Sequence, residues 1–498
     1  MVLVRVALPP PLPSLLFQPP ANCFPISTRQ VRSVASLCAL ATAALAVTPV
    51  EVKGSQLVVS GTDTRFQIIG VDYQPGGEAG YKPQEKKDTL TNVDACLRDA
   101  ILLQRLGVNT IRVYNLNPEL NHDECVSIFN AAGIYMILDV NSPLAGDSLD
   151  RTDPVPSYHE GYLKRIFGIV EAFKDYPNLL GFFGGNEVIN EDSTKEVPAY
   201  IRAGQRDLKD YIANHSDRKI PVGYSAAHVE DLLADTWEYL SCDDPKSPSS
   251  KSDFFGLNSY SWCGDSTFEN AGYDKLVTQF KDSAIPVFFS EYGCNGIRPR
   301  IFTEVEALYG EEMTQAMVGG LVYEYSHEEA DYGLVVINDN GTASLMADYD
   351  NLMDQYNKLD IKMLQSMDAK SSNAKPKKCS KDLIKGSKFL NDFDLPKLPK
   401  GGDKLIKDGV PNAKNGKLVE VKETELKTTV YDVKGQPLDG LKLKILSDDQ
   451  SNLPGENTSG SPKPADDDED DKSAAVRGAT SGVLAALAVL GTSMMLMA

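Results

Sequence analysis

The sequence predicts an α/β protein, a (β/α)8 TIM barrel followed by a small C-terminal accessory β-region. Three observations predict this fold. Short apolar, β-rich runs alternate with longer stretches of helical periodicity. Eight such units occur over roughly 260 residues, the size of a (β/α)8 barrel. The runs are apolar on both faces, which indicates a parallel sheet covered by helices. A doubly wound open sheet is the alternative, but no Gly-rich dinucleotide turn is present.

The eight expected strands are spread over the first two thirds of the chain. They are Phe66–Gln74, Asn109–Leu116, Tyr135–Val140, Leu180–Glu187, Ile220–Ala226, Phe254–Trp262, Pro286–Gly293 and Gly319–Ser326. Helical periodicity lies between them, for example over Val93–Leu106, Tyr162–Lys174 and Val197–Ala213. Beyond Cys379 the composition becomes rich in Lys, Pro and Gly, and Leu418–Leu446 alternates like a few antiparallel strands with a turn near Lys434–Gly435.

The two ends of the chain look like processing signals. Ser33–Val47 is a short apolar run preceded by arginines and ended by small residues, which predicts a secretory signal peptide. Val483–Ala498 is a terminal apolar run behind a short spacer and small residues, which predicts a GPI-attachment signal with Ser473 as the attachment residue. A C-terminal membrane helix is the alternative. We therefore expect a secreted protein anchored by GPI at the outer face of the plasma membrane, in the cell wall.

These features divide the chain into five expected segments. They are a leader and signal peptide (1–46), a catalytic barrel (47–379), an accessory β-region (380–446), a polar and acidic disordered stalk (447–472) and the GPI-attachment signal (473–498).

Cysteine content and charge agree with export and limit the partners. Of eight cysteines, Cys23 and Cys38 would leave with the leader, and the remaining six allow fifteen disulfide pairings. No spacing resembles a zinc site, and we expect neither a metal nor a cofactor. The net charge of −20 argues against a nucleic-acid partner, and nothing in the sequence indicates the oligomeric state. N-glycosylation sequons occur at Asn214, Asn340 and Asn457.

Two glutamates at strand ends carry the chemical prediction. In a barrel of this kind, functional side chains follow the strands at the C-terminal face. The fourth expected strand ends in Asn186-Glu187, and the seventh contains Glu291. Cleavage of a glycosidic bond needs a proton donor and a second carboxylate, and a separation of about 5–5.5 Å would give retention of configuration. Asn186 suits the sugar 2-hydroxyl, so Glu187 is expected to be the acid/base and Glu291 the nucleophile.

Six motifs reinforce this interpretation. They are Gly70–Gly77, Thr110–Pro118, Gly184–Val188, Val222–Ala227, Ser290–Cys294 and Gly319–Ser326. Over roughly residues 50 to 380 they resemble family 72 of the glycoside hydrolases, the fungal GPI-anchored β-1,3-glucanosyltransferases of the cell wall. The resemblance implies a retaining enzyme that cleaves a β-1,3-glucan donor and transfers the chain to the non-reducing end of an acceptor glucan, which elongates cell-wall glucan.

The resemblance also implies individual residues. Glu187 becomes the proton donor and Glu291 the nucleophile, with glucan contacts expected from Tyr114, Asn186, Tyr323, Gln74, Asp139 and Tyr260. For Asp139 an ion-paired structural role is as plausible as a sugar contact, and Gln74 and Tyr260 are equally open. The implied disulfides are Cys96–Cys125, Cys242–Cys379 and Cys263–Cys294.

The chain departs from the family pattern in two places. His228 and Leu233 stand where many members carry Asp and Arg, and no cysteine follows Cys379, so the Cys-rich carbohydrate-binding module of some members is absent. A hydrolytic endo-β-1,3-glucanase is the main alternative, and a non-catalytic glucan-binding wall protein is a more distant one.

Overall fold

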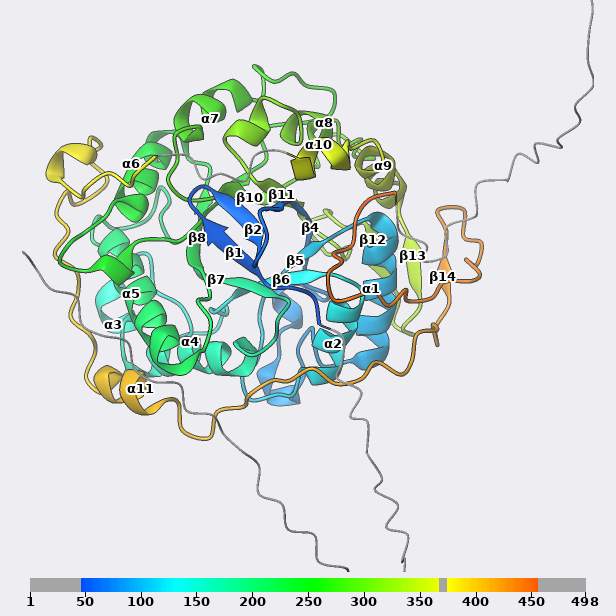
Figure 1. The fold of residues 1–498 in the computed structure, drawn as a ribbon, viewed down its shortest axis with the longest axis horizontal. Helices are drawn as coiled ribbons and strands as arrows, with labels where there is room; N and C mark the ends of the chain where they lie inside the picture. The colour runs from blue at the N-terminus through cyan, green and yellow to red at the C-terminus, as the bar shows by residue number, and fades with distance from the viewer. Residues whose placement is uncertain (1–45, 367–373, 456–498) are drawn as a thin grey trace, which may run out of the picture. The chain divides into compact units, whose positions relative to one another are not determined.

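The computed structural model describes residues 46–366 and 374–455, and a closed barrel of eight strands lies at its centre (Figure 1). Neighbouring strands are parallel, in the order β10-β11-β4-β5-β6-β7-β8-β9 around the barrel. The strands are β4 (Ile68–Tyr73), β5 (Thr110–Val113), β6 (Tyr135–Asp139), β7 (Leu179–Asn186), β8 (Val222–Ala227), β9 (Phe255–Ser259), β10 (Val287–Tyr292) and β11 (Gly319–Val322). The predicted (β/α)8 fold is confirmed.

Helices surround the barrel (Figure 1). They are α1 (Val93–Leu106), α2 (Asp123–Ala131), α3 (Pro154–Ser157), α4 (Glu160–Phe173), α5 (Val197–His215), α6 (Glu230–Ser241), α7 (Tyr273–Phe280), α8 (Glu304–Leu308), α9 (Ala347–Tyr356) and α10 (Ile361–Ser366). Short 3-10 helices are η1 (Glu78–Gly80), η2 (Pro83–Glu85), η3 (Pro248–Ser250), η4 (Met313–Gln315) and η5 (Lys381–Leu383). Local sequence sets the ends of α1. Asn92 accepts a hydrogen bond from the amide of Ala95, and Gly107 takes a left-handed φ of 87° that suits glycine.

A small antiparallel sheet that the sequence did not predict closes the base of the barrel. It contains β1 (Val50–Lys53), β2 (Gln56–Val59) and β3 (Arg65–Phe66), and in Figure 1 the first two strands lie across the centre of the barrel. Leu57 and Phe66 belong to one buried cluster with the barrel side chains Ile137 and Phe288. Removing this apolar surface from water stabilises the base of the barrel.

The barrel interior changes character from base to mouth. Its lower part holds apolar side chains, whereas the layer above contains buried Asp72, Arg112, Asn258 and Glu291. Alternation along each strand explains the layering, because inward positions are two residues apart. On β4, for example, Ile68 lies in the apolar layer and Asp72 in the polar one. The polar layer lies at the end of the barrel where the candidate site residues gather.

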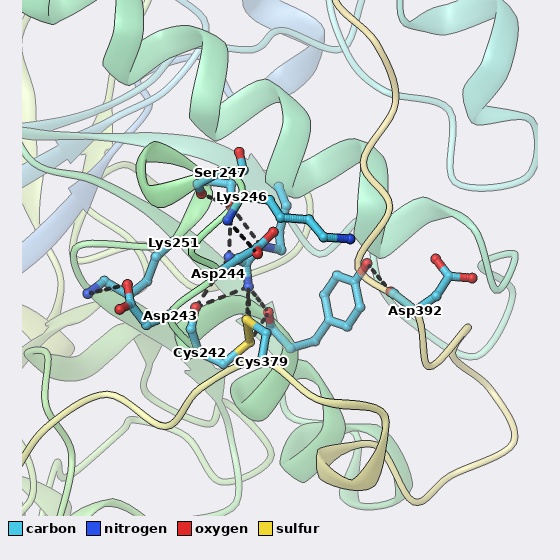
Figure 2. Close-up of a disulfide and its surroundings, with 11 residues drawn as sticks. Cys242, Asp243, Asp244, Lys246, Ser247, Lys251, Cys379 and Asp392 are labelled. Carbon is cyan, nitrogen blue, oxygen red and sulfur yellow. Dashed lines mark hydrogen bonds and ion pairs between the residues drawn. A yellow bond between two sulfur atoms is a disulfide. The ribbon is translucent and has the colours of Figure 1, made fainter.

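Residues 374–455, which we call the C-terminal strap, run along the outside of the helices. The disulfide Cys242–Cys379 attaches the strap to the end of α6, and nearby the carbonyl of Asp392 accepts a hydrogen bond of 3.1 Å from Tyr239 (Figure 2). After α11 (Gly402–Asp408), the strap hydrogen-bonds to side chains of α5, α4, α2 and α1. The strap therefore follows about half of the helical ring, as the yellow-to-orange segment in Figure 1 shows.

The β-structure of the strap is smaller than the predicted group of antiparallel strands. One short strand, β14 (Val430–Tyr431), pairs in parallel with β13 (Ala343–Leu345), which pairs with β12 (Val335–Ile337). Two isolated antiparallel bridges accompany it, and Gly435, at the expected turn, has a φ of 75°. Several strap residues, such as Val410, Lys417 and Lys444, donate hydrogen bonds to helix side chains. An alternating sequence pattern does not distinguish such a segment from a strand of a sheet.

The first residues of the predicted stalk, 447–455, contact the rest of the described chain. Residues 447–450 are exposed, but Asn452 is almost fully buried and donates hydrogen bonds to the carbonyls of Gln104 and Val108. The carbonyl of Asp448 also accepts a bond of 2.8 Å from the amide of Thr48. The partners in these hydrogen bonds are hundreds of residues apart in the sequence. Local polar composition, from which a disordered stalk was predicted, therefore does not reveal them. The rest of the stalk, the signal peptide, Asn457, Ser473 and the GPI-attachment signal lie outside the described residues.

None of the helices in residues 46–366 and 374–455 has both the length and the apolar character that a membrane crossing requires.

Candidate active site

The two glutamates line a single cavity of about 390 Å³ at the mouth of the barrel. Glu187 directly follows β7, and Glu291 lies near the end of β10. The predicted site residues Gln74, Tyr114, Asp139, Asn186 and Tyr323 also line this cavity. Tyr260 is not one of the lining residues, but its hydroxyl contacts Glu291. Residues at the ends of seven strands are thus brought together, as expected for strand ends in a closed barrel.

Irregular backbone accompanies both glutamates. The pairing of β7 with β8 shifts between Phe183 and Asn186, and the pairing of β10 with both neighbours shifts after Phe289. Such bulges redirect the side chains that follow them. Glu187 itself has a φ of 49°, a left-handed conformation that costs a non-glycine residue about 1–3 kcal/mol. Its amide donates to the carbonyl of Ser225 at 2.8 Å, which holds this conformation.

Three donors surround the carboxyl group of Glu291. One oxygen, Oε1, accepts from Arg112 Nη1 at 3.1 Å and from the Tyr114 hydroxyl at 3.0 Å, and Oε2 accepts from the Tyr260 hydroxyl at 2.7 Å. Burial raises the pKa of Glu291, whereas the charge of Arg112 and the two hydroxyls lower it and the charge of Glu187 raises it. All three donors favour the ionised form of Glu291, since an ionised carboxyl group only accepts hydrogen bonds. They oppose the cost of burying that charge.

The side-chain amide of Asn258 holds the carboxyl group of Glu187. Its Oε1 accepts from Asn258 Nδ2 at 2.8 Å, and the same nitrogen donates to Asn186 Oδ1 at 3.1 Å. The Asn258 oxygen accepts from the hydroxyls of Ser225 and Ser290, at 2.9 and 2.8 Å. Because two hydroxyls fix the oxygen side, the nitrogen side must face the two cavity residues. Asn258 therefore orients Asn186 and Glu187 together.

Arg112 connects the lower part of the site. Its guanidinium forms two parallel bonds to Asp139, Nε–Oδ2 at 2.8 Å and Nη2–Oδ1 at 3.0 Å, in addition to the bond to Glu291. The predicted site residue Asp139 is thus an ion-paired carboxylate that also lines the cavity. Such a pair of parallel hydrogen bonds fixes the orientation of the Arg112 guanidinium and also balances its charge. Arg112 also lies 4.4 Å from the ring centre of Tyr114.

A further carboxyl, Asp72, lies in the same layer with no exposed surface. Among the described residues, neither of its oxygens accepts a hydrogen bond that meets ordinary geometric limits. Burial raises its pKa well above the usual value, Arg112 lowers it and Glu291 raises it. The Tyr114 hydroxyl is close enough to lower the pKa further, but its single proton points to Glu291. Burial without an accepted hydrogen bond therefore favours the protonated form of Asp72.

Three tyrosines form a cluster at one side of the mouth. The ring centres of Tyr260 and Tyr323 are 6.4 Å apart, and Tyr332 lies 5.5 Å from the first and 5.3 Å from the second. All three side chains are half-buried. Partly exposed aromatic faces with polar tips suit contact with sugar rings and hydroxyls.

Four residues of the site were not predicted from the sequence: Arg112, Asn258, Asp72 and Tyr332. A signal for the first three existed, because each lies two residues before a predicted site residue on the same strand and therefore faces the same side. Tyr332 had no such signal, since it lies in the connection between β11 and β12.

The three disulfides of the described chain have the implied pairing. They are Cys96–Cys125, Cys242–Cys379 and Cys263–Cys294. The last bridge joins the segment after Tyr260 to the segment after Glu291, so it links the two stretches of chain that carry this hydrogen-bonded pair. Of the two residues that differ from the family pattern, Leu233 is buried in the core, and His228 hydrogen-bonds through Nδ1 to the Ser259 hydroxyl at 2.8 Å.

Comparison with known sequences identifies the class of protein. The sequence model of the glucanosyltransferases, glycoside hydrolase family 72, matches residues 39–360. The chain belongs to this family.

Individual relatives cover most of the chain. It is 60% identical over 431 residues to the 1,3-beta-glucanosyltransferase gel2 of Aspergillus fumigatus, which covers 86% of this chain and 90% of the relative. It is 43% identical to the probable 1,3-beta-glucanosyltransferase GAS3 of Saccharomyces cerevisiae, over 84% of this chain and 83% of the relative. Among solved structures it resembles a mutant of Saccharomyces cerevisiae Gas2p in complex with laminaritetraose and laminaripentaose. That match has a TM-score of 0.61 and 35% identity, and covers 71% of this chain and 75% of the other.

Proposed function

We propose that this protein is a retaining β-1,3-glucanosyltransferase that cleaves a β-1,3-glucan chain and transfers it to the non-reducing end of another. The observation that carries the proposal is the placement of Glu187 and Glu291 in one cavity with different partners. Glu291 has three donors that favour its ionised form, whereas Glu187 receives one amide hydrogen bond. This difference suits a nucleophile and an acid/base. The names of the relatives and the laminari-oligosaccharides bound to Gas2p support the choice of substrate.

In the first step, Glu291 attacks the anomeric carbon of an internal glucose. Glu187 gives its proton to the oxygen of the leaving chain, and the bond between the two sugars breaks. The products are a glycosyl ester on Glu291 and a released fragment that carries the original reducing end. Arg112, Tyr114 and Tyr260 position the attacking carboxylate. Asn186, oriented by Asn258, is the candidate partner of the sugar 2-hydroxyl.

In the second step, the 3-hydroxyl at the non-reducing end of an acceptor glucan attacks the same anomeric carbon from the side opposite the ester. Glu187 takes the hydroxyl proton, Glu291 leaves as a carboxylate, and a new β-1,3 bond forms. Two displacements restore the original configuration. Water competes with the acceptor, and the tyrosine cluster offers aromatic faces that favour a sugar over water.

Incubation of the protein with a reduced laminari-oligosaccharide tests the proposal. Transfer produces oligosaccharides both longer and shorter than the substrate, in amounts that chromatography and mass spectrometry measure. Shorter products alone would identify a hydrolase and overturn the transfer step.

Variants of the two glutamates test their separate roles. We expect Glu187→Ala and Glu291→Ala to lose transfer, whereas the exposed control Glu191→Gln keeps it. With a donor whose leaving group needs no proton, such as a dinitrophenyl β-glucan oligosaccharide, azide added to Glu187→Ala should yield a β-glycosyl azide, since the ester then forms without the acid. Azide added to Glu291→Ala should yield the α-glycosyl azide by a single displacement. The opposite pair of products would exchange the roles of the two residues.

We also propose that the protein is exported and anchored by GPI in the cell wall. The leader and tail sequences, three disulfides and exposed sequon residues Asn214 and Asn340 support this location. Sequencing of the mature N-terminus, together with release of the protein from membranes by a phosphatidylinositol-specific phospholipase C, tests it. A protein that stays on membranes after the phospholipase treatment would contradict the anchor.

A further inference from the structure

A buried arginine behind the tyrosine cluster has no role in the two steps above. Arg300 is 2% exposed and lies in the connection between β10 and α8. Its Nε donates at 2.7 Å to Oδ1 of Asp348, in the first turn of α9. The backbone of Arg300 is bound to the same helix, since its amide donates to Asp348 Oδ1 at 3.3 Å and its carbonyl accepts from Asn351 Nδ2 at 2.7 Å. Arg300 is therefore anchored on α9.

Helix α9 is in turn fixed to the barrel. Tyr349 and Tyr356 of this helix have no exposed surface. The Tyr349 hydroxyl donates to the carbonyl of Leu102 on α1 at 2.7 Å, and the Tyr356 hydroxyl donates to the carbonyl of Gly70 on β4 at 3.0 Å. A side chain that extends from such an element has a rigid support.

The other two nitrogens of the Arg300 guanidinium bind backbone at the mouth of the barrel. Nη1 donates to the carbonyls of Gly293 at 3.3 Å and Tyr323 at 2.7 Å, and Nη2 donates to the carbonyls of Tyr332 and Gly333. Together with the bond to α9, the five N–H groups of the guanidinium have five described acceptors. Five is the full donor capacity of an arginine side chain.

These carbonyls lie at both ends of one loop. The chain leaves β11 at Tyr323 and returns to the barrel at Tyr332, and the amide of Glu324 donates to the Tyr332 carbonyl at 3.1 Å. Residues 329–331, between these ends, are exposed. The loop is thus bound at its base. Arg300 fixes the backbone that carries two of the three rings of the tyrosine cluster.

We propose that Arg300 is a positioning residue for the transfer step, because it holds Tyr323 and Tyr332 where their rings meet the acceptor glucan. This inference rests on the proposed function. Without Arg300 the two rings lose their fixed placement, so water takes a larger share of the glycosyl ester on Glu291. A displacement of about 1 Å in a group that positions a substrate can cost about 100-fold in rate, so a shift of the loop is enough to change this competition.

Two substitutions weaken the hold of Arg300 on the loop, and a third is the matched control. Arg300→Lys keeps the positive charge beside Asp348, but one ammonium group cannot reach α9 and both ends of the loop at once. Asp348→Ala keeps the guanidinium and removes its anchor. The control is Arg202→Lys on α5. Arg202 is also fully buried and donates to backbone carbonyls, those of Tyr239 and Cys242, but it does not line the catalytic cavity.

The assay measures the ratio of transfer to hydrolysis on a reduced laminari-oligosaccharide. Each new reducing end reports hydrolysis, and each elongated product reports transfer. Both products arise from the same ester, so the ratio does not depend on the fraction of the protein that is folded. We expect the ratio to fall about tenfold in Arg300→Lys and about threefold in Asp348→Ala, and to stay within about twofold of wild type in Arg202→Lys.

A double-mutant cycle tests whether Arg300 acts through the tyrosines. In a Tyr332→Ala or a Tyr323→Ala background, Arg300→Lys should lower the ratio by less than it does in wild type, because one of the rings that it positions is absent. An effect of the same size in both backgrounds as in wild type would contradict action through these rings and overturn the proposal.

The remaining outcomes separate this inference from the proposed function. An unchanged ratio in Arg300→Lys would leave Arg300 with a structural role alone and overturn the proposal, and Asp348→Ala decides the question if Arg300→Lys does not fold. An equal fall in Arg202→Lys would also overturn it, since the ratio would then respond to the loss of any buried guanidinium. Absence of elongated products in wild type would overturn the transferase itself.

Discussion

The hydroxyl of Tyr260 provides a direct test of how the site keeps Glu291 ionised. It donates to Oε2 at 2.7 Å, whereas Arg112 and Tyr114 both donate to Oε1. Tyr260→Phe therefore removes the sole described donor to one oxygen but keeps the ring. A hydrogen bond to a charged group contributes about 1.5–3 kcal/mol. Since 1.36 kcal/mol corresponds to one pKa unit, its loss should raise the pKa of Glu291 by about 1–2 units.

The pH profile of kcat/KM measures this shift, because its acid limb reports the group that must be ionised in the free enzyme. Without the donor the protonated form is favoured, so we expect the acid limb of Tyr260→Phe to move by about 1–2 pH units to higher pH. Tyr332→Phe is the matched control. Its ring belongs to the same cluster, but its hydroxyl makes no described hydrogen bond to Glu291. An unmoved acid limb with only a higher KM would refute the reasoning and leave Tyr260 as a sugar contact alone.

Three further predictions concern the surroundings of the site. Burial raises the pKa of Asp72 in the folded protein, so folding favours its protonated form. This contribution to stability is complete below about pH 4 and is lost as the pH rises through the raised pKa. The difference in Tm between Asp72→Asn and wild type should therefore grow in favour of the variant from pH 4 to 7, and a constant difference would contradict this. Asn258→Ala should lower kcat by about 10- to 100-fold with little change in KM, because Glu187 loses its amide donor. An unchanged kcat would show that Asn258 does not position Glu187. Replacing Cys242 and Cys379 by serine opens a link across 137 residues and should lower the free energy of unfolding by about 5 kcal/mol, measured by denaturant titration; a loss below about 1 kcal/mol would show that strap contacts alone hold this segment.

Much of the barrel could be predicted because its signals are local. Each strand of the barrel is a short apolar run whose period and length can be recognised without its neighbours. The base sheet was missed, since β1 to β3 are short and lie directly before the first barrel strand. The strap was interpreted as a small β-region because Leu418–Leu446 alternates. In the structure, long-range bonds such as that from the amide of Lys444 to Gln104 decide its path, and no periodicity encodes them.

In the site, too, the residues with a local sequence signal could be predicted and the long-range contacts could not. Glu187 and Glu291 could be identified because each ends a recognisable strand, and Asn186 next to the first suggested its role. Tyr114 and Tyr260 were predicted as glucan contacts, but the structure shows both hydroxyls donating to Glu291. That arrangement depends on strands β5, β9 and β10 facing one centre, which sequence order does not state.

The sequence by itself determined the (β/α)8 class and the two glutamates at strand ends, because both depend on residues close to one another in the chain. The tertiary structure alone decided which groups control them. Arg112 meets Glu291 across 179 residues, and Asn258 meets Glu187 across 71. The physical reason is that hydrogen bonds and burial act over a few ångströms in space. Only the closed barrel brings these distant positions within that range.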